Sequence, residues 1–345
     1  MLLATILLCG LPSCAHPRER EARVNRQLQP PLRCIILENP HYPGAPLTVA
    51  IIGLDNSDEA PLRAVIHQNG KELSGARFFV SDCAVDNEDI LIAIPGIPLE
   101  AEAGPAMVEI RGGSWPGVRL VDGEEVPIED NSLRYIHFAI DEHEYPNTVL
   151  KMNAKNTALV YKADPEKTRQ SKELWQVISS FNPMALHHSD RFIPPTNTTR
   201  RSSGFGDMRS YHYSNGKITH SWHLGIDFPA PTGTPVRAPG PGRVIMATER
   251  IVSGNSIIIE HLPGLISILY HLDSINCRVG DLVDSGSLVG TVGSTGFSTG
   301  PHLHWEVRSG TIPVDPDVFL AIPLIDKERI ITTMNAKYGR TAEGG

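Results

Sequence analysis

Between residues 200 and 315 the sequence has no helical period of useful length, and short β-rich runs alternate there with dense glycine. The runs lie at 242–247, 256–261, 266–271, 288–292 and 304–308. Apolar and β-branched runs that are bounded by glycine are typical of short strands joined by tight turns. We therefore predict a compact all-β domain over residues 200–322.

The preceding segment, residues 32–163, has a similar pattern at regular spacing. Apolar stretches such as 47–54 and 90–94 are separated by turn signals that include Asn69-Gly70. Regular short strands with turns between them predict a β-sandwich of roughly immunoglobulin type. A chain of 345 residues is also too long for one ordinary core. The expected fold class is therefore predominantly all-β, with two domains.

One helix is predicted in the linker at 164–199. Asp164 suits the N-cap and is followed by a proline, which suits the first helical position. Leu174, Ile178 and Phe181 are spaced to form one apolar stripe. We expect this helix to pack across the junction between the two domains.

The N-terminus carries the signs of export. Residues 2–11 form an apolar run that is too short to span a bilayer but suits a secretion signal. We predict a signal or lipoprotein-type leader at 1–14, a polar tether at 15–31 and a periplasmic or cell-envelope location. Cys14 is the candidate for lipidation and membrane anchoring; a plain cleaved signal and a misassigned start codon are the alternatives. Residues 323–345 are interpreted as a C-terminal tail.

The distribution of charge limits the kinds of partner that this chain can bind, and the cysteines raise the question of a disulfide. Residues 32–165 hold 21 Asp and Glu against 10 Lys and Arg, and residues 196–322 hold 10 against 9. Neither segment has the basic excess of a nucleic-acid binder, so we expect no nucleic-acid partner. Cys34 and Cys83 fall within one predicted domain, where a disulfide and two buried free thiols are both open.

Two other groups of metal-binding residue types have simpler interpretations. His187 and His188 are adjacent, and adjacent side chains rarely point to one ion, so we interpret them as linker residues. Asp86, Glu88 and Asp89 are interpreted as a solvated acidic loop rather than a calcium site.

Three short segments hold histidines at spacings that suit a metal site. His223 and Asp227 are four residues apart, which places both side chains on one face of a strand and equally of a helix. Gly225 and the following Phe228-Pro229 argue against a helix, so we predict an extended segment. In the run HLHWEV at 302–307, two imidazoles alternate with large apolar side chains, which predicts a strand with both imidazoles on one face. His271 ends the β-rich run at 266–271.

These residue types match the needs of a zinc hydrolase. A catalytic zinc has three protein ligands, commonly imidazoles and a carboxylate, and a fourth position open for water. Peptide hydrolysis also needs a base for the water and a donor for the oxyanion. The side chains available for these roles are His223, Asp227, His271, His302 and His304. Spacing alone does not separate the ligands from the acid–base residues.

Residues 202–320 resemble the LytM/lysostaphin-type zinc endopeptidases, which cleave peptides of bacterial peptidoglycan. The matching text is SGFG at 203–206, HLGIDF at 223–228, YHL at 270–272 and GSTGFSTGPHLHWEV at 293–307. The resemblance implies that Zn²⁺ is bound by His223, Asp227 and His304. It also implies that His271 and His302 are the catalytic pair and that peptidoglycan peptides are the substrate.

The sequence thus predicts an exported zinc metalloendopeptidase that acts on the cell wall. The alternatives are a non-catalytic, cell-wall-binding regulator of other wall hydrolases and a zinc-binding surface scaffold. A regulator that arose by loss of zinc ligands would have substitutions at the five positions, and none is substituted here.

Several neighbours of the motifs have two open interpretations. Glu306 is either a carboxylate that holds an imidazole by its free N–H or a partly exposed strand residue. A second set either borders the substrate groove or consists of ordinary loop residues: Tyr211, Tyr213, His220, Ser298 and Thr299.

Overall fold

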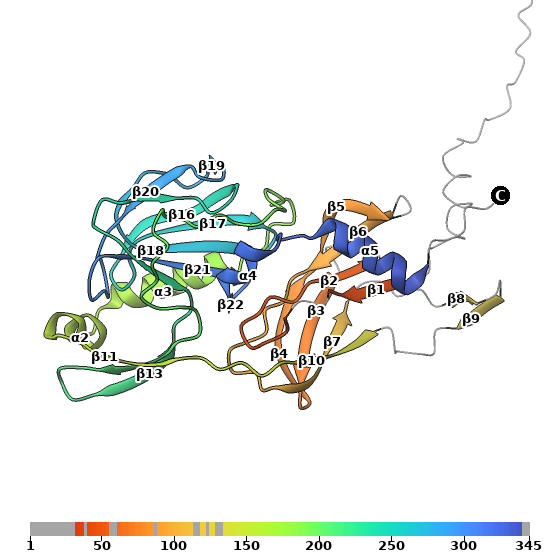
Figure 1. Cartoon of the computed structure of the whole chain (residues 1–345), viewed down its shortest axis with the longest axis horizontal. Coiled ribbons are helices and arrows are strands. Elements are labelled where there is room, and N and C mark those ends of the chain that lie inside the picture. Colours follow the sequence, from red (N-terminus) through yellow and green to blue (C-terminus); the bar gives the residue numbers. More distant parts are fainter. Residues whose placement is uncertain are drawn as a thin grey trace, which may run out of the picture.

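The computed structural model describes residues 32–37, 40–54, 61–85, 88–112, 118–121, 124–127 and 134–339. The predicted leader at 1–14, the tether at 15–31 and Asp86 lie outside these ranges. No helix within the described ranges is long and apolar enough to cross a membrane. Strands make up most of the regular structure, as Figure 1 shows, so the prediction of a predominantly all-β fold is confirmed.

The N-terminal part is a sandwich of two four-stranded antiparallel sheets, with orders β1-β2-β6-β5 and β10-β7-β3-β4. Its strands are β1 (Arg33–Ile36), β2 (Val49–Ile52), β3 (Arg63–Gln68), β4 (Lys71–Arg77), β5 (Phe79–Val85), β6 (Glu88–Ala93), β7 (Gly104–Arg111) and β10 (Tyr135–Ile140). Ile51 and Leu91 from the first sheet share one buried core with Ile66 and Val108 from the second. The predicted sandwich is therefore present. A separate two-stranded ribbon is formed by β8 (Val118–Val121) and β9 (Glu124–Pro127).

The C-terminal part is built on a nine-stranded sheet, whose main path is β14-β21-β18-β17-β16-β19. Its strands are β14 (Ile226–Pro229), β15 (Pro235–Arg237), β16 (Gly242–Arg250), β17 (Gly254–Leu262), β18 (Leu265–Ile275), β19 (Leu282–Val283), β20 (Leu288–Val292), β21 (His302–Ser309) and β22 (Ile312–Val314). All five predicted β-rich runs fall on these strands. Leu303, Trp305 and Val307 on β21 are fully buried in the core, as their alternation predicts.

A separate three-stranded sheet was not predicted. It consists of β11 (Asn147–Lys151), β12 (Met208–His212) and β13 (Ile218–Trp222), and β11 pairs with β12 in parallel. Figure 1 shows it beside the nine-stranded sheet, next to α2 (Ala154–Tyr161). The sequence assigns β11 to the sandwich domain, whereas the structure pairs it with a strand that follows the linker. The predicted domain boundary at 163 stays a prediction.

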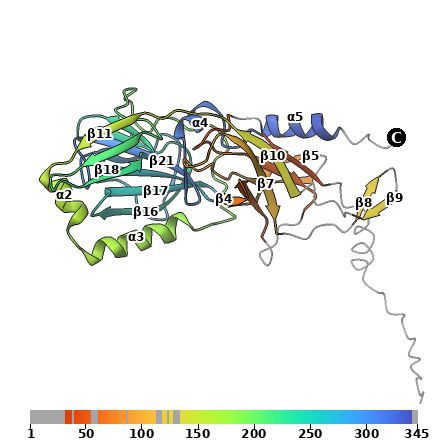
Figure 2. The same cartoon turned by 90° about the horizontal axis from the view of Figure 1, so that it is seen from below.

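Helix α3 (Pro165–Ile178) begins where the sequence predicts, because the Asp164 side chain accepts a hydrogen bond from the backbone N–H of Glu166. Its end also agrees. Its packing differs from the prediction: Ile178 packs on Met246 of the nine-stranded sheet, and Figure 2 shows the helix lying along that sheet. Contact with the sandwich is made beyond the helix by Phe181, whose ring centroid lies 4.4 Å from the Arg77 guanidinium.

The C-terminal segment returns to the sandwich. After the short helix α4 (Pro316–Ala321), α5 (Lys327–Tyr338) occupies much of the segment interpreted as a tail. Its Tyr338 hydroxyl donates to the backbone carbonyl of Cys34 at 2.8 Å. Cys34 and Cys83 are buried free thiols, so the described structure contains no disulfide between them.

Candidate metal centre and active site

Three of the predicted residues converge at one point of the nine-stranded sheet. Asp227 on β14 pairs in register with His304 on β21, and His223 lies in the turn before β14. Asp227 Oδ1 is 3.0 Å from His223 Nε2 and 2.8 Å from His304 Nδ1. Among the described residues, these are the only group of three or more His, Cys, Asp or Glu whose ligand atoms lie close enough to hold a metal ion.

Gly225 allows this convergence. A Cβ built on Gly225 would lie 2.3 Å from the backbone oxygen of Trp305, far inside van der Waals contact. Any other residue would therefore push the turn that carries His223 away from β21. The glycine is required by close approach of two backbones, as its place in the motif suggests.

Hydrogen bonds determine which ring nitrogen of His223 and of His304 faces the candidate metal position. His223 Nδ1 lies 2.7 Å from the backbone carbonyl of Gly204, which can only accept, so His223 Nε2 is free. His304 Nε2 lies 3.1 Å from the Glu306 carboxylate, which leaves His304 Nδ1 free. The two free nitrogens are 2.9 Å apart. Both nitrogens therefore point at the position where a metal ion would bind, and His304 Nδ1 offers a lone pair there once it has lost its proton.

Glu306 has the first of its two predicted roles. It is 5% exposed, holds the His304 ring and receives a hydrogen bond from Arg308 Nε at 2.7 Å. Burial alone would raise the pKa of the Glu306 carboxyl, but Arg308 and His304 lower it to about 2. The carboxylate thus stays charged and keeps the imidazole oriented.

The charges around Asp227 suit a cation. Burial alone would raise the pKa of Asp227, but the close contacts with the His223 and His304 imidazoles hold it well below its usual range. Burial would lower the pKa of His304, yet its bonds to Asp227 and Glu306 raise it to about 9. A metal ion that binds here must therefore displace a proton from His304, which couples metal affinity to pH.

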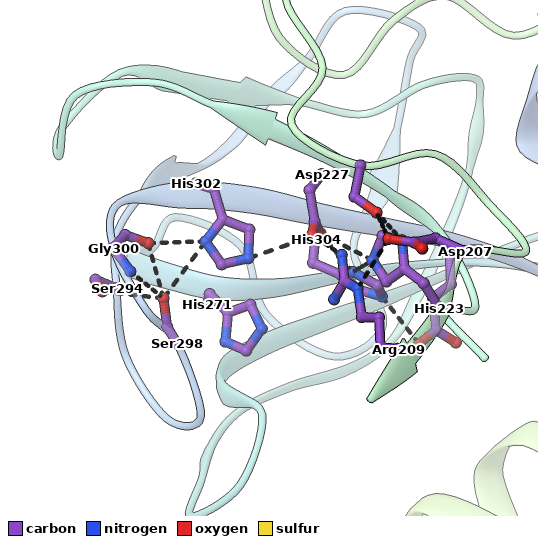
Figure 3. A network of polar contacts seen from close by, with 12 residues as sticks. Asp207, Arg209, His223, Asp227, His271, Ser294, Ser298, Gly300, His302 and His304 are labelled. Carbon is purple, nitrogen blue, oxygen red and sulfur yellow. Dashed lines mark hydrogen bonds and ion pairs between the residues drawn. The ribbon is translucent and has the colours of Figure 1, made fainter. Parts of the chain in front are cut away.

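The second predicted pair lies beside this cluster. The ring centroids of His271 and His302 are 4.8 Å apart, and His302 Nε2 is 3.7 Å from Asp227 Oδ1 (Figure 3). Burial, with a smaller effect of the neighbouring imidazoles, lowers the pKa of His271 to about 3. His271 is thus neutral at neutral pH.

His271 also has a strained backbone. Its φ is +62°, in the left-handed region that non-glycine residues seldom adopt. The strain of such a residue is of order 1–3 kcal/mol and is often found at functional sites. It coincides here with a bulge in β18, where the pairing with β17 shifts register between Leu269 and Leu272.

All five predicted site residues line a cleft of about 370 Å³. Of the open groove candidates, Tyr211, Ser298 and Thr299 line it, whereas Tyr213 and His220 do not. Tyr211 and His220 lie on strands β12 and β13 rather than in a loop.

The other candidate groups lie away from the cleft lining. His188 stacks on Phe192, with ring centroids 5.7 Å apart, and His187 is not among the cleft residues. Glu88 forms an ion pair with Arg33 at 3.8 Å. The acidic-loop interpretation is wrong for Glu88 and Asp89, because both lie on strand β6. The interpretation of His187 and His188 as linker residues stays a prediction.

Two cleft residues were missed by the sequence analysis. Arg209 on β12 donates to Asp227 Oδ2 at 2.6 Å, and Asn156 on α2 donates to the backbone carbonyl of Ser298 at 3.0 Å. An isolated arginine or asparagine carries no sequence signal. Only the pairing of β11 with β12 brings both to the cleft.

Comparison with known proteins agrees with this geometry. Residues 221–316 match Peptidase family M23. The M23 match contains all five site residues, and it confirms the resemblance predicted for this segment. Strands β11 and β12 and helix α2 precede it.

Curated relatives of the M23 segment include the DD-carboxypeptidase/endopeptidase Mpg of Neisseria meningitidis serogroup B, which is 42% identical over 133 residues. That alignment covers 38% of this chain and 29% of Mpg. The peptidoglycan DD-endopeptidase ShyB of Vibrio cholerae is 38% identical over 33% of this chain and 26% of ShyB. The alignments thus span less than a third of these relatives.

A solved structure extends the likeness beyond the M23 segment. The crystal structure of a putative peptidase M23 from Pseudomonas aeruginosa is 25% identical, with a TM-score of 0.50. The match covers 82% of this chain and 95% of that one. Most of this chain therefore has the fold of that protein.

Proposed function

We propose that this protein is a zinc metalloendopeptidase that hydrolyses peptide bonds of bacterial peptidoglycan. One observation carries the proposal: the free nitrogens of His223 and His304 and one oxygen of Asp227 converge beside His271 and His302 in a single cleft. Two imidazoles and a carboxylate form a common ligand set for catalytic zinc.

The donor atoms fit zinc in number and type. His223 Nε2, His304 Nδ1 and Asp227 Oδ1 would hold the ion, and three protein ligands leave a position open. When bound, zinc lowers the pKa of a coordinated water to about 7 and polarises the carbonyl of the substrate. The remaining chemistry falls to the protein's own side chains.

His271 and His302 supply proton transfer and hydrogen bonding. Each ring's Nδ1 donates to a backbone carbonyl, of Thr295 and Gly300 respectively, at 2.8 Å. Each Nε2 is therefore available to take a proton from the attacking water, to give one to the leaving amine, or to donate to the oxyanion. The pairing of two such rings at one end of the cleft supports the role of both in catalysis.

The substrate is inferred from relatives. Mpg is named for DD-carboxypeptidase and endopeptidase activity, and ShyB is named a peptidoglycan DD-endopeptidase. We infer a peptide of the cell wall as the substrate and the cell envelope as the place of action. Export through the leader at 1–14, with Cys14 as the lipid-anchored residue, is part of the same proposal; mass spectrometry of the mature N-terminus tests it.

Incubation of the purified protein with isolated peptidoglycan tests the activity. We expect one zinc per chain by inductively coupled plasma mass spectrometry and the release of peptide fragments that are identifiable by mass. Full zinc occupancy without released fragments would instead support a non-catalytic wall-binding regulator. A chain that binds no zinc would contradict the proposed function.

A further inference from the structure

The two oxygens of Asp227 have separate partners. Oδ1 faces the candidate metal position, 3.0 Å from His223 Nε2 and 2.8 Å from His304 Nδ1. Oδ2 accepts a hydrogen bond from Arg209 Nη2 at 2.6 Å. Arg209 lies on β12, and Figure 3 shows its side chain close to Asp227 and Asp207. One carboxylate therefore has one oxygen for the metal and one for the guanidinium.

The position of Arg209 is fixed by three interactions. Its strand β12 is the middle strand of the three-stranded sheet, paired with β11 and β13. Its side chain is 13% exposed, and its Nε lies 3.6 Å from Asp207 Oδ2. Asp207 is in turn held by the Ser203 hydroxyl, which donates to the same oxygen at 2.8 Å. A guanidinium held on both sides by buried carboxylates has little freedom to leave Asp227.

The chemistry of carboxylates makes this contact consequential. A carboxylate can bind a metal ion through one oxygen or through both. Binding through both would fill a further position, although a catalytic zinc site needs a position for water and room for the substrate carbonyl. The charge of Arg209 also draws electron density from Asp227, which leaves more of the metal's charge to act on water.

We propose that Arg209 is a positioning residue that holds Asp227 in one-oxygen ligation. The proposal rests on the proposed function, because it assumes that Asp227 binds the metal. It extends that function to a strand outside the M23 match, since Arg209 precedes residue 221. The segment before the family domain thus sets the number of open positions at the metal.

Replacement of zinc by cobalt tests this directly, because the visible absorption of Co²⁺ is stronger in four-coordinate than in five-coordinate sites. We expect Arg209→Gln to weaken this absorption and to add about one oxygen ligand to the zinc site in X-ray absorption spectra. The kcat/KM should fall roughly 10- to 100-fold. Arg209→Lys retains a charged donor and should restore the wild-type spectrum and part of the activity.

Two further variants guard the interpretation. Arg209→Met keeps much of the side-chain length and has no polar group that needs a hydrogen bond. The coordination number of the metal can therefore be measured in this variant even if the Arg209→Gln protein folds poorly. Arg201→Gln is the matched control, because Arg201 pairs with Asp317 on the surface, and its spectrum should equal that of the wild type.

Wild-type coordination in both Arg209→Gln and Arg209→Met would overturn the inference, as would a change confined to KM, which would indicate direct contact with substrate. Failure of the wild type to bind cobalt or zinc would instead contradict the proposed function. Metal binding by the wild type therefore distinguishes the two failures.

Discussion

His271 and His302 face each other with ring centroids 4.8 Å apart, and each donates its Nδ1–H to a backbone carbonyl at 2.8 Å. Backbone acceptors cannot donate back, so both rings are held in the same tautomer. Neither ring belongs to the group of His223, Asp227 and His304 that would hold the metal. The pair thus has hydrogen-bond partners of its own, distinct from those of the candidate ligand group, although Asp227 Oδ1 lies only 3.7 Å from His302 Nε2.

This separation predicts a split between turnover and metal content. His271→Ala and His302→Ala should each lower the release of peptides from peptidoglycan by roughly 10²- to 10⁴-fold, with about one zinc retained. His271→Asn is a useful companion, because Asn tolerates the positive φ at this position better than Ala does. His223→Ala should lose both zinc and activity. Loss of zinc from the His271 variants would show that the assigned roles are wrong.

Removal of the metal should destabilise the protein. An ion that binds only the folded state adds free energy of unfolding by mass action, about 4 kcal/mol at a free concentration of one thousand times its Kd. We therefore expect a chelator to lower the melting temperature and added zinc to restore it, as followed by differential scanning calorimetry. His223→Ala should melt at the same temperature with and without the chelator, since its ligand set is incomplete.

The sequence predicts the site well where the pattern is local. The alternation at 302–307 places Leu303, Trp305 and Val307 in the core, and these three side chains are fully buried. The extended segment predicted from His223 to Asp227 is only partly present: Asp227 lies on β14, whereas His223 lies in the turn before it. The division of the five residues into ligands and acid–base groups came from family resemblance. Their spacing in the sequence indicates which side chains can lie together, but not which of their nitrogen and oxygen atoms can bind a metal.

The parts that were missed depend on long-range pairing. β11 and β12 are separated by about sixty residues and pair in parallel. No tight turn connects them, so no local turn motif in the sequence predicts this sheet. Arg209 and Asn156 reach the cleft only through it. Helix α5 did leave a local signal, since Ile330 and Met334 are four residues apart and both fully buried. Its interpretation as a tail overlooked that signal.

Asn156 links α2 to the loop at the cleft, and its burial makes it sensitive to charge. It is 1% exposed, and its amide donates to the Ser298 carbonyl at 3.0 Å. Asn156→Asp keeps the shape but puts a buried carboxylate opposite a carbonyl oxygen. We expect the free energy of unfolding in urea to fall by at least ~1–3 kcal/mol. The exposed Asn215→Asp should change it by less than ~0.5 kcal/mol; equal effects would refute this account.

His261 should make stability depend on pH. Burial lowers the pKa of His261 to about 3, and its Nδ1 donates to the Pro241 carbonyl at 2.7 Å. The unfolded chain, with an ordinary histidine pKa of about 6.5, takes up this proton first as pH falls. The contribution of His261 to the free energy of unfolding is therefore fully present above pH ~6.5. It declines as the pH falls toward ~3, by at most ~1.4 kcal/mol per pH unit.

Variants at His261 isolate this contribution from other titrating groups. His261→Gln can still donate to Pro241 but does not titrate, so its free energy of unfolding should fall less between pH 6.5 and 5 than that of the wild type. His220→Gln, at an exposed position on β13, should retain the wild-type dependence. Urea titrations at several pH values measure both. Parallel curves for the wild type and His261→Gln would exclude His261 as the source.

Gly225 gives the sharpest steric test of how the candidate ligands His223, Asp227 and His304 are brought together. Its φ is not in the left-handed region, so the conflict for alanine is one of space. The added Cβ would lie 2.3 Å from the Trp305 backbone oxygen, 2.8 Å from its carbonyl carbon and 3.1 Å from Glu306 Cγ. β14 must then move away from β21, and this shift separates Asp227 from His304, which pair in register. We expect Gly225→Ala to weaken zinc binding and to lower the free energy of unfolding by ~1–3 kcal/mol.

Gly204→Ala is the matched control. It lies near the same cluster, and its backbone carbonyl accepts from His223, but a Cβ on Gly204 has no heavy atom of another residue within 4 Å apart from its chain neighbours. Zinc titration and urea unfolding should therefore give values close to the wild type for Gly204→Ala and reduced values for Gly225→Ala. If both variants bind zinc equally well, the close approach of the turn to β21 does not position the ligands, and Asp227 and His304 keep their register by other contacts of the sheet.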